Sequence, residues 1–138
     1  MNKKTLNQYR SLQKEVPKLK KDIDKLYKKL EDVPVVKGKV TKSAEEHPYI
    51  EEHISVEMEE PEEATAIRKQ IRLKELRLEK AEKNKLNIEE FIAGIEDSTD
   101  RQIFELYFME GNKQERVGEL VGYTKGRVSQ KISQYLKD

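Results

Sequence analysis

Apolar residues recur at helical spacing near the start of the chain. Between positions 12 and 30 they alternate at intervals of four and three: Leu12, Val16, Leu19, Ile23, Leu26 and Leu30. This heptad spacing places them on one side of a helix, with lysines filling the other side. Pro17 interrupts the pattern, so we expect the regular helix to begin near Val16, with residues 6–12 forming a separate turn. Because the apolar seam is narrow, it predicts a partner helix.

Residues 32–63 carry helix-breaking residues. Pro34, Gly38, Pro48 and Pro61 exclude a continuous helix. Two stretches, residues 35–40 and 54–58, are typical of strands, and the second alternates strictly between apolar and polar residues. They predict either a small β-hairpin or an extended acidic linker, and the pattern leaves both alternatives open.

Helical spacing returns after Pro61, where Glu62 and Glu63 suit the positive end of a helix dipole. The apolar stripe that follows is formed by Ile67, Ile71, Leu78 and Ala81, widened by Leu73 and Leu76. It continues as one long helix or two consecutive helices through Leu86, Ile88, Phe91, Ile92 and Ile95. We expect this stripe to pack against the first helix as an antiparallel hairpin, or to form the seam of a dimer.

The remaining residues predict three short helices. Ser98 is expected to cap a densely apolar helix that closes at Gly111. Asn112 and Glu115 have the spacing of a capping box, which would open the next helix, over residues 114–121.

The spacing of residues 114–136 is that of a helix-turn-helix. Gly122 ends the first helix and supplies the positive φ that the turn needs, and Thr124 caps the second helix, over residues 125–136. Gly118 supplies the small residue that a close crossing of the two helices requires. The apolar residues expected between the helices are Val117, Val121, Tyr123, Val128 and Ile132. The residues expected to complete this core are Phe104, Phe108, Ile88, Phe91, Ile92 and Ile95.

These patterns together predict a mainly α protein. It combines an N-terminal helical hairpin or coiled coil, with either a small β-hairpin or a linker, and a C-terminal trihelical helix-turn-helix domain. The expected segments are an N-terminal helix over 1–31, an extended acidic segment over 32–63, a long helix over 64–95 and the helix-turn-helix domain over 96–138.

The C-terminal residues resemble region 4 of sigma-70 factors. The resemblance lies in residues 101–111 (RQIFELYFMEG), 114–118 (QERVG) and 122–128 (GYTKGRV). With its lysine-rich helical N-terminal half, the whole chain resembles the RinA/ArpU-type late-gene activators of phages and prophages. The resemblance implies promoter DNA as the partner, because region 4 reads the −35 promoter element in its family. The sequence departs from the sigma pattern at Gly126 and Ser129.

Composition limits the chemistry that the chain can perform. The 138 residues include 28 Lys and Arg, 27 Asp and Glu and no Cys, which excludes disulfides, thiolate catalysis and cysteine-based zinc sites. His47 and His53 have no third ligand at a suitable spacing, so we expect no metal site, no cofactor and no catalytic group, and the chain is not predicted to be an enzyme.

Charge and hydropathy suggest the location and the partners. The net charge of +1 conceals segregation, because residues 1–44 carry +8, residues 45–63 carry −9 and residues 111–138 carry +3. No apolar run approaches the ~20 residues that span a bilayer. Residues 1–10 lack the apolar core of a secretion signal, so we expect a protein of the bacterial cytoplasm with no membrane partner.

The second helix of the helix-turn-helix carries most of the predicted contacts with double-stranded DNA. Its first residues reach base edges in this docking mode, and Lys125 and Gln130 match positions that read bases in the sigma family. Gly126 lets the backbone approach the DNA closely. The other residues expected at bases or flanking phosphates are Lys113, Arg116, Thr124, Arg127, Ser129, Lys131, Ser133 and Gln134. Each of these has the alternative of an ordinary solvated side chain.

The sequence thus predicts a sequence-specific transcription regulator, which the resemblance identifies as an activator of late genes. We expect the N-terminal half to form a homodimer or to contact RNA polymerase. One alternative is a DNA-packaging protein like the phage terminase small subunit, although in that family the helix-turn-helix usually precedes the oligomerising helices. Another is a coiled-coil adaptor that binds protein, which should bind DNA only weakly, without sequence preference and with a steep dependence on salt.

Overall fold

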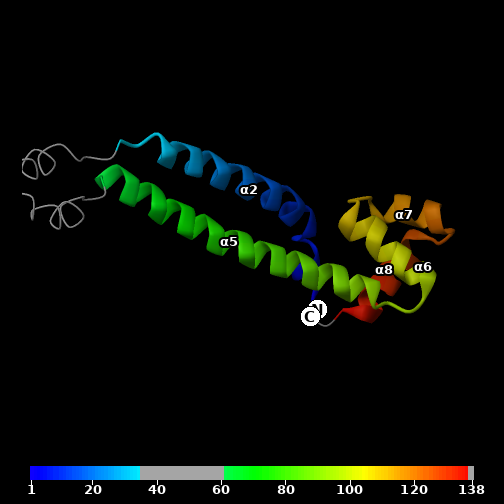
Figure 1. Cartoon of the computed structure of the whole chain (residues 1–138). Coiled ribbons are helices and arrows are strands. Elements are labelled where there is room, and N and C mark those ends of the chain that lie inside the picture. The colour runs from blue at the N-terminus through cyan, green and yellow to red at the C-terminus, as the bar shows by residue number, and fades with distance from the viewer. Residues whose placement is uncertain (35–60, 137–138) are drawn as a thin grey trace, which may run out of the picture. The chain divides into compact units, whose positions relative to one another are not determined.

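The computed structural model describes residues 1–34 and 61–136. Over these residues the protein is mainly helical, which confirms the predicted fold class (Figure 1). The elements in chain order are α1 (Lys3–Leu6), α2 (Tyr9–Glu31), α5 (Glu62–Ala93), α6 (Ser98–Phe104), the π-helical turn η2 (Glu105–Met109), α7 (Gln114–Val121) and α8 (Lys125–Tyr135). The strands predicted at 35–40 and 54–58 lie outside the described residues. Within the described part of the chain, no helix is long and apolar enough to cross a membrane.

The chain divides into two compact units. Unit 1 contains residues 1–18 and 78–138, and unit 2 contains residues 19–77. Helices α2 and α5 each contribute one part to each unit. The units therefore divide the chain differently from the predicted ranges 1–31, 32–63, 64–95 and 96–138, because the start of the chain joins the C-terminal helices.

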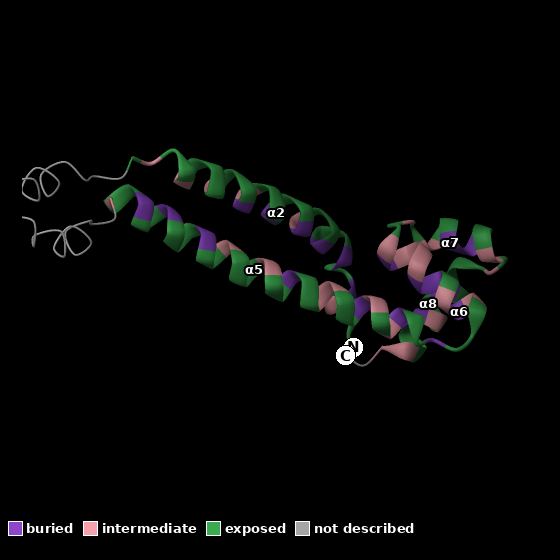
Figure 2. Cartoon of the chain, in the orientation of Figure 1, coloured by how far each residue is buried: buried purple, intermediate pink, exposed green. Residues whose placement is uncertain are grey.

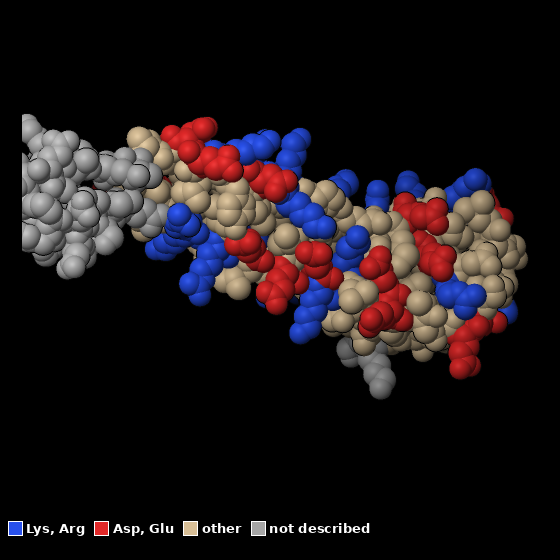
Figure 3. Space-filling view, in the orientation of Figure 1, with Lys and Arg blue, Asp and Glu red and all other residues tan. Residues whose placement is uncertain are grey.

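Unit 2 is built from antiparallel segments of α2 and α5 (Figure 1). Their buried residues lie on facing sides of the two helices (Figure 2), as the apolar stripes predict: Leu19, Ile23, Ala64, Ile67 and Ile71. At the edge of this seam, Lys74 lies 3.5 Å from the carboxylate of Asp22. Basic and acidic side chains are interspersed over the visible face of these helices (Figure 3). Of the two alternatives that the apolar stripes left open, a hairpin and a dimer seam, unit 2 contains the antiparallel hairpin.

Helix α2 passes through Pro17, so the prediction that the helix begins near Val16 is wrong. Proline removes one backbone donor and its ring crowds the carbonyl four residues earlier, here that of Gln13. Both Gln13 and Pro17 are exposed, so the carbonyl that loses its partner lies on the solvent side of the helix. Leu12, Val16 and Leu19 are buried on the opposite side, and their packing keeps the helix continuous.

Helix α5 is continuous from Glu62 to Ala93, which decides between one long helix and two. Three leucines predicted to belong to its apolar stripe do not. Leu73, Leu76 and Leu86 are 56%, 55% and 52% exposed, because they lie on the side of α5 away from the buried isoleucines. The apolar stripe predicted from helical spacing was wider than the buried stripe, because a single partner helix covers only one side of α5.

The core of unit 1 combines residues from both ends of the chain. The predicted contributions of α5 and of the three C-terminal helices are confirmed, with Ile88, Ile92, Ile95, Phe104 and Val128 in a single cluster and Phe91 packed against it. The buried residues that α1 and α2 add to this cluster are Leu6, Tyr9, Leu12 and Val16. Tyr9 also donates a hydrogen bond of 2.8 Å to the carboxylate of Glu89. The C-terminal helices therefore share one core with the N-terminal segment.

Two predicted helix caps are wrong. Asp97, and not Ser98, caps α6, and its carboxylate accepts a hydrogen bond of 2.9 Å from the backbone N–H of Asp100. Helix α7 begins after Lys113 without a side-chain cap, so Asn112 and Glu115 form no capping box. The Asn112 amide donates instead to the carbonyl of Leu106, across the left-handed Gly111.

Candidate nucleic-acid interface

The turn between α7 and α8 has the geometry that its sequence predicts. Gly122 ends α7 with φ of 79°, and the hydroxyl of Thr124 accepts a hydrogen bond of 3.1 Å from the N–H of Arg127. A Cβ at Gly118 would collide with the carbonyl oxygen of Tyr123. The close approach predicted at Gly118 is therefore made to the backbone of the turn, rather than to a side chain of α8.

Helix α8 has one buried side and one exposed side. Val128 and Ile132 are buried against the core. Four predicted DNA contacts lie together on the exposed side: Ser129, Gln130, Ser133 and Gln134. These hydroxyls and amides carry no charge, so they can donate and accept hydrogen bonds with base edges without a strong attraction for phosphates.

Basic residues lie at the N-terminal ends of α7 and α8. Lys113 and Lys125, both exposed, line a hollow of about 450 Å³. Asn7, from the turn between α1 and α2, lies in the same lining. The guanidinium of Arg10 lies against Gly111, which also lines the hollow and where any Cβ would meet that guanidinium. The structure thus brings residues from the start of the chain beside the helix-turn-helix.

The remaining predicted contacts have different surroundings. Arg116 pairs with Glu119 at 3.0 Å, and both side chains are more than half exposed, so the pair is weak and the guanidinium can exchange partners. The guanidinium of Arg127 lies 4.6 Å from the ring centre of Tyr123, a cation–π contact worth ~0.5–1 kcal/mol at an exposed site. Gly126 is exposed, and a Cβ there would meet nothing within 4 Å.

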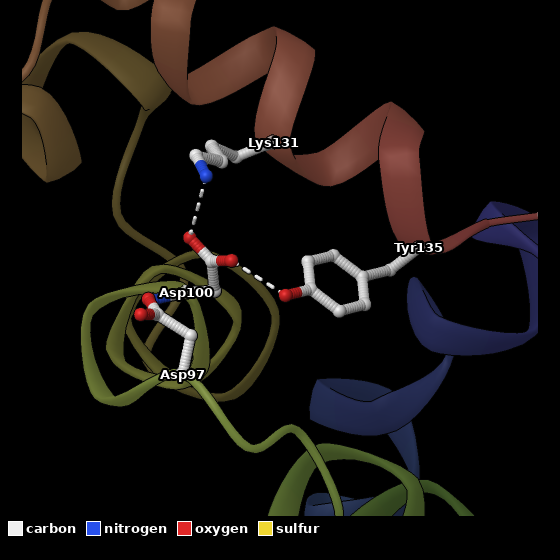
Figure 4. A network of polar contacts seen from close by, with 4 residues as sticks. All are labelled: Asp97, Asp100, Lys131 and Tyr135. Carbon is white, nitrogen blue, oxygen red and sulfur yellow. Dashed lines mark hydrogen bonds and ion pairs between the residues drawn. The ribbon is translucent and has the colours of Figure 1, made fainter.

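Lys131 differs from the other predicted contacts because it faces the protein. Its ammonium lies 3.4 Å from Oδ1 of Asp100, and its side chain is only 23% exposed (Figure 4). The hydroxyl of Tyr135, one turn further along α8, donates a hydrogen bond of 2.5 Å to Oδ2 of the same carboxylate. A role for Lys131 at a phosphate would require breaking its pair with Asp100.

Sequence reasoning missed Asn7, Arg10 and Asp100. No local pattern could have placed Asn7 or Arg10, because their neighbours at Gly111 and Lys113 lie about a hundred positions away in the chain. Asp100 gave a weak signal, since Lys131 and Tyr135 are four residues apart and so lie on one side of α8.

Unit 1 should lose stability at alkaline pH, because two of its tyrosines have raised pKa values. The hydrogen bond to Asp100, followed by burial, raises the pKa of Tyr135 to about 12. Burial, followed by the hydrogen bond to Glu89, raises the pKa of Tyr9 to about 12. An unfolded tyrosine ionises near pH ~10, so this stabilisation is complete below pH ~10 and is lost as the pH rises toward 12. The free energy of unfolding, measured with urea at a series of alkaline pH values, should decline less in Tyr9→Phe and in Tyr135→Phe than in the wild type. A decline in the double variant equal to that of the wild type would contradict this prediction.

Comparison of the chain with protein-family models, with curated proteins and with solved structures found no match. Within the described residues, no group of three or more His, Asp or Glu side chains could hold a metal ion.

Proposed function

We propose that this chain is a sequence-specific DNA-binding transcription regulator that reads the major groove with α8. The observation that carries the proposal is the arrangement around the turn. A left-handed Gly122, the cap at Thr124 and the close approach at Gly118 hold α8 so that its uncharged polar side faces away from the core. A helix presented in this way fits the width of the major groove.

The distribution of polar groups supports a division between base and phosphate contacts. Gln130 and its polar neighbours on α8 offer paired donors and acceptors, and a Gln amide matches the edge of adenine. Lys125, at the first position of α8, can reach guanine or a phosphate. Lys113, Arg116 and Arg127 supply flanking cations. Lys113 and Lys125, which line the same hollow, offer two cations to a backbone phosphate.

The resemblance to RinA/ArpU-type activators supports a role in late-gene transcription, with RNA polymerase as a second partner. In unit 2, Leu73 and Leu76 are exposed on α5, although both are large apolar residues. A second copy of the chain that covers these leucines would form a homodimer, and a dimer would bind two DNA half-sites at once.

Selection of bound duplexes from a random DNA pool tests the proposal, and footprinting then locates the site. We expect one recurring motif. A terminase-like packaging protein would also recover a motif, but one that matches packaging regions of phage DNA. An adaptor would recover no motif and would bind weakly and with a steep salt dependence.

Substitution of Lys125 or Gln130 by Ala should weaken binding to the selected duplex by ~1–3 kcal/mol and relax the preference at one or two base pairs. Lys28→Ala, on the exposed side of α2 in unit 2, is the matched control for the loss of a positive charge. A competition binding assay with single-base variants of the duplex measures both effects. Wild-type affinity and preference in both variants would show that these residues do not read bases.

A further inference from the structure

Asp100 is the buried carboxylate of unit 1 that contacts two successive turns of α8. It is 3% exposed, lies near the start of α6, and faces both Lys131 and Tyr135 (Figure 4). Tyr135 donates to Oδ2 at 2.5 Å, and the Lys131 ammonium lies 3.4 Å from Oδ1. Among the described residues, no hydrogen bond reaches Oδ1. The ammonium is therefore attracted to Oδ1 as a charge and is not fixed by a directional bond.

The charge on Lys131 has two competing uses. A buried carboxylate is costly without a counter-charge, so Asp100 draws the ammonium toward the core. A DNA phosphate would attract the same ammonium outward, and every cation that binds a phosphate increases affinity for any sequence. While it is paired with Asp100, Lys131 adds nothing to this sequence-independent term, and the exposed side of α8 keeps its neutral Ser and Gln residues.

We propose that Asp100 is a positioning residue that determines sequence discrimination: it fixes the orientation of α8 through Tyr135 and withholds the charge of Lys131 from DNA phosphates. The inference rests on the proposed function of α8 as the reading helix. It assigns to Asp100 an effect on specificity although its buried side chain does not touch DNA. Removing the charge of Asp100 should increase affinity for unrelated DNA and reduce discrimination.

Asp100→Asn separates this role from a purely structural one. The amide has the size of the carboxylate and can still accept the Tyr135 hydrogen bond, but it cannot neutralise Lys131. Binding of the full chain to the selected duplex and to a scrambled duplex is measured by fluorescence anisotropy between about 50 and 200 mM salt. We expect tighter binding to the scrambled duplex, a slope of log affinity against log salt that is steeper by about 0.9, and a specificity ratio reduced roughly threefold or more.

Two further variants isolate the charge and the orientation. Asp100→Asn combined with Lys131→Gln should return the salt slope to the wild-type value, because no freed ammonium remains. Tyr135→Phe removes the hydroxyl but keeps the ring, which packs edge-to-face on Phe104 with 5.5 Å between the ring centres. It should lower the specificity ratio without changing the salt slope, and it tests the orientation even if Asp100→Asn does not fold.

The outcomes distinguish this inference from the proposed function. An equal loss of affinity for both duplexes in Asp100→Asn, with an unchanged salt slope, shows a structural role only and overturns the inference. An unchanged ratio in Tyr135→Phe overturns the orientation effect. A wild-type chain that prefers no duplex overturns the proposed function itself, and the inference with it.

Discussion

Gly118→Leu should unfold the helix-turn-helix and not merely weaken its binding to DNA. A Cβ at this position already collides with the backbone carbonyl of Tyr123, and a backbone atom in a capped turn cannot move aside as a side chain can. Overpacking in cores typically costs ~1–3 kcal/mol, and we expect at least the upper end of that range. Thermal and urea unfolding followed by circular dichroism measure the loss.

Gly126→Ala is the matched control for Gly118→Leu. Gly126 lies in the first turn of α8, where a Cβ would meet nothing within 4 Å, so alanine should leave stability unchanged or raise it by up to ~1 kcal/mol through its higher helix propensity. If Gly118→Leu melts like the wild type and loses only DNA binding, the inferred close approach between α7 and the turn is wrong.

Leu6→Ala should destabilise the helix-turn-helix although the two are far apart in sequence. Leu6 is fully buried in the cluster that contains Phe104, Val117 and Val128. Truncation of a buried leucine to alanine costs ~2–5 kcal/mol, depending on how far the site can collapse. A marginally stable unit would lose most of its folded population, so DNA affinity should fall together with the free energy of unfolding.

Leu86→Ala is the control for the Leu6 variant, because Leu86 belongs to the same unit but is 52% exposed. Its effect should lie within ~0.5 kcal/mol of zero. Equal stability of Leu6→Ala and Leu86→Ala would show that the start of the chain contributes nothing to the core of unit 1.

The sequence predicted those features that depend on neighbouring residues. The positive φ at Gly122 and the cap at Thr124 follow from local backbone chemistry, and both are confirmed. The buried side of α8 follows from the spacing of Val128 and Ile132, because helical periodicity fixes which residues share a side.

The features that the sequence did not predict depend on contacts between distant residues. Whether Leu73 is buried depends on how much of the surface of α5 the partner helix covers. The spacing of apolar residues along α5 does not contain that information. Pro17 is tolerated because the carbonyl that it leaves unpaired faces solvent, which only the packing of α2 reveals. In the sequence, Asp100 is an ordinary acidic residue in the first turn of a helix. Its role is apparent only from its contacts with Tyr135 and Lys131 in the folded chain.

The composition of the unit 1 core determines when this unit can form during synthesis. Leu6 is synthesised more than a hundred residues before Val128 and Ile132, which complete the same cluster. Core contacts between such distant positions form slowly, because a long loop must close before any of them is gained. Helices α2 and α5 can pair earlier within unit 2 and shorten that search. The helix-turn-helix should therefore acquire its native packing only once Val128 and Ile132 have left the ribosome, and until then Leu6 and its neighbours are exposed to chaperones and proteases.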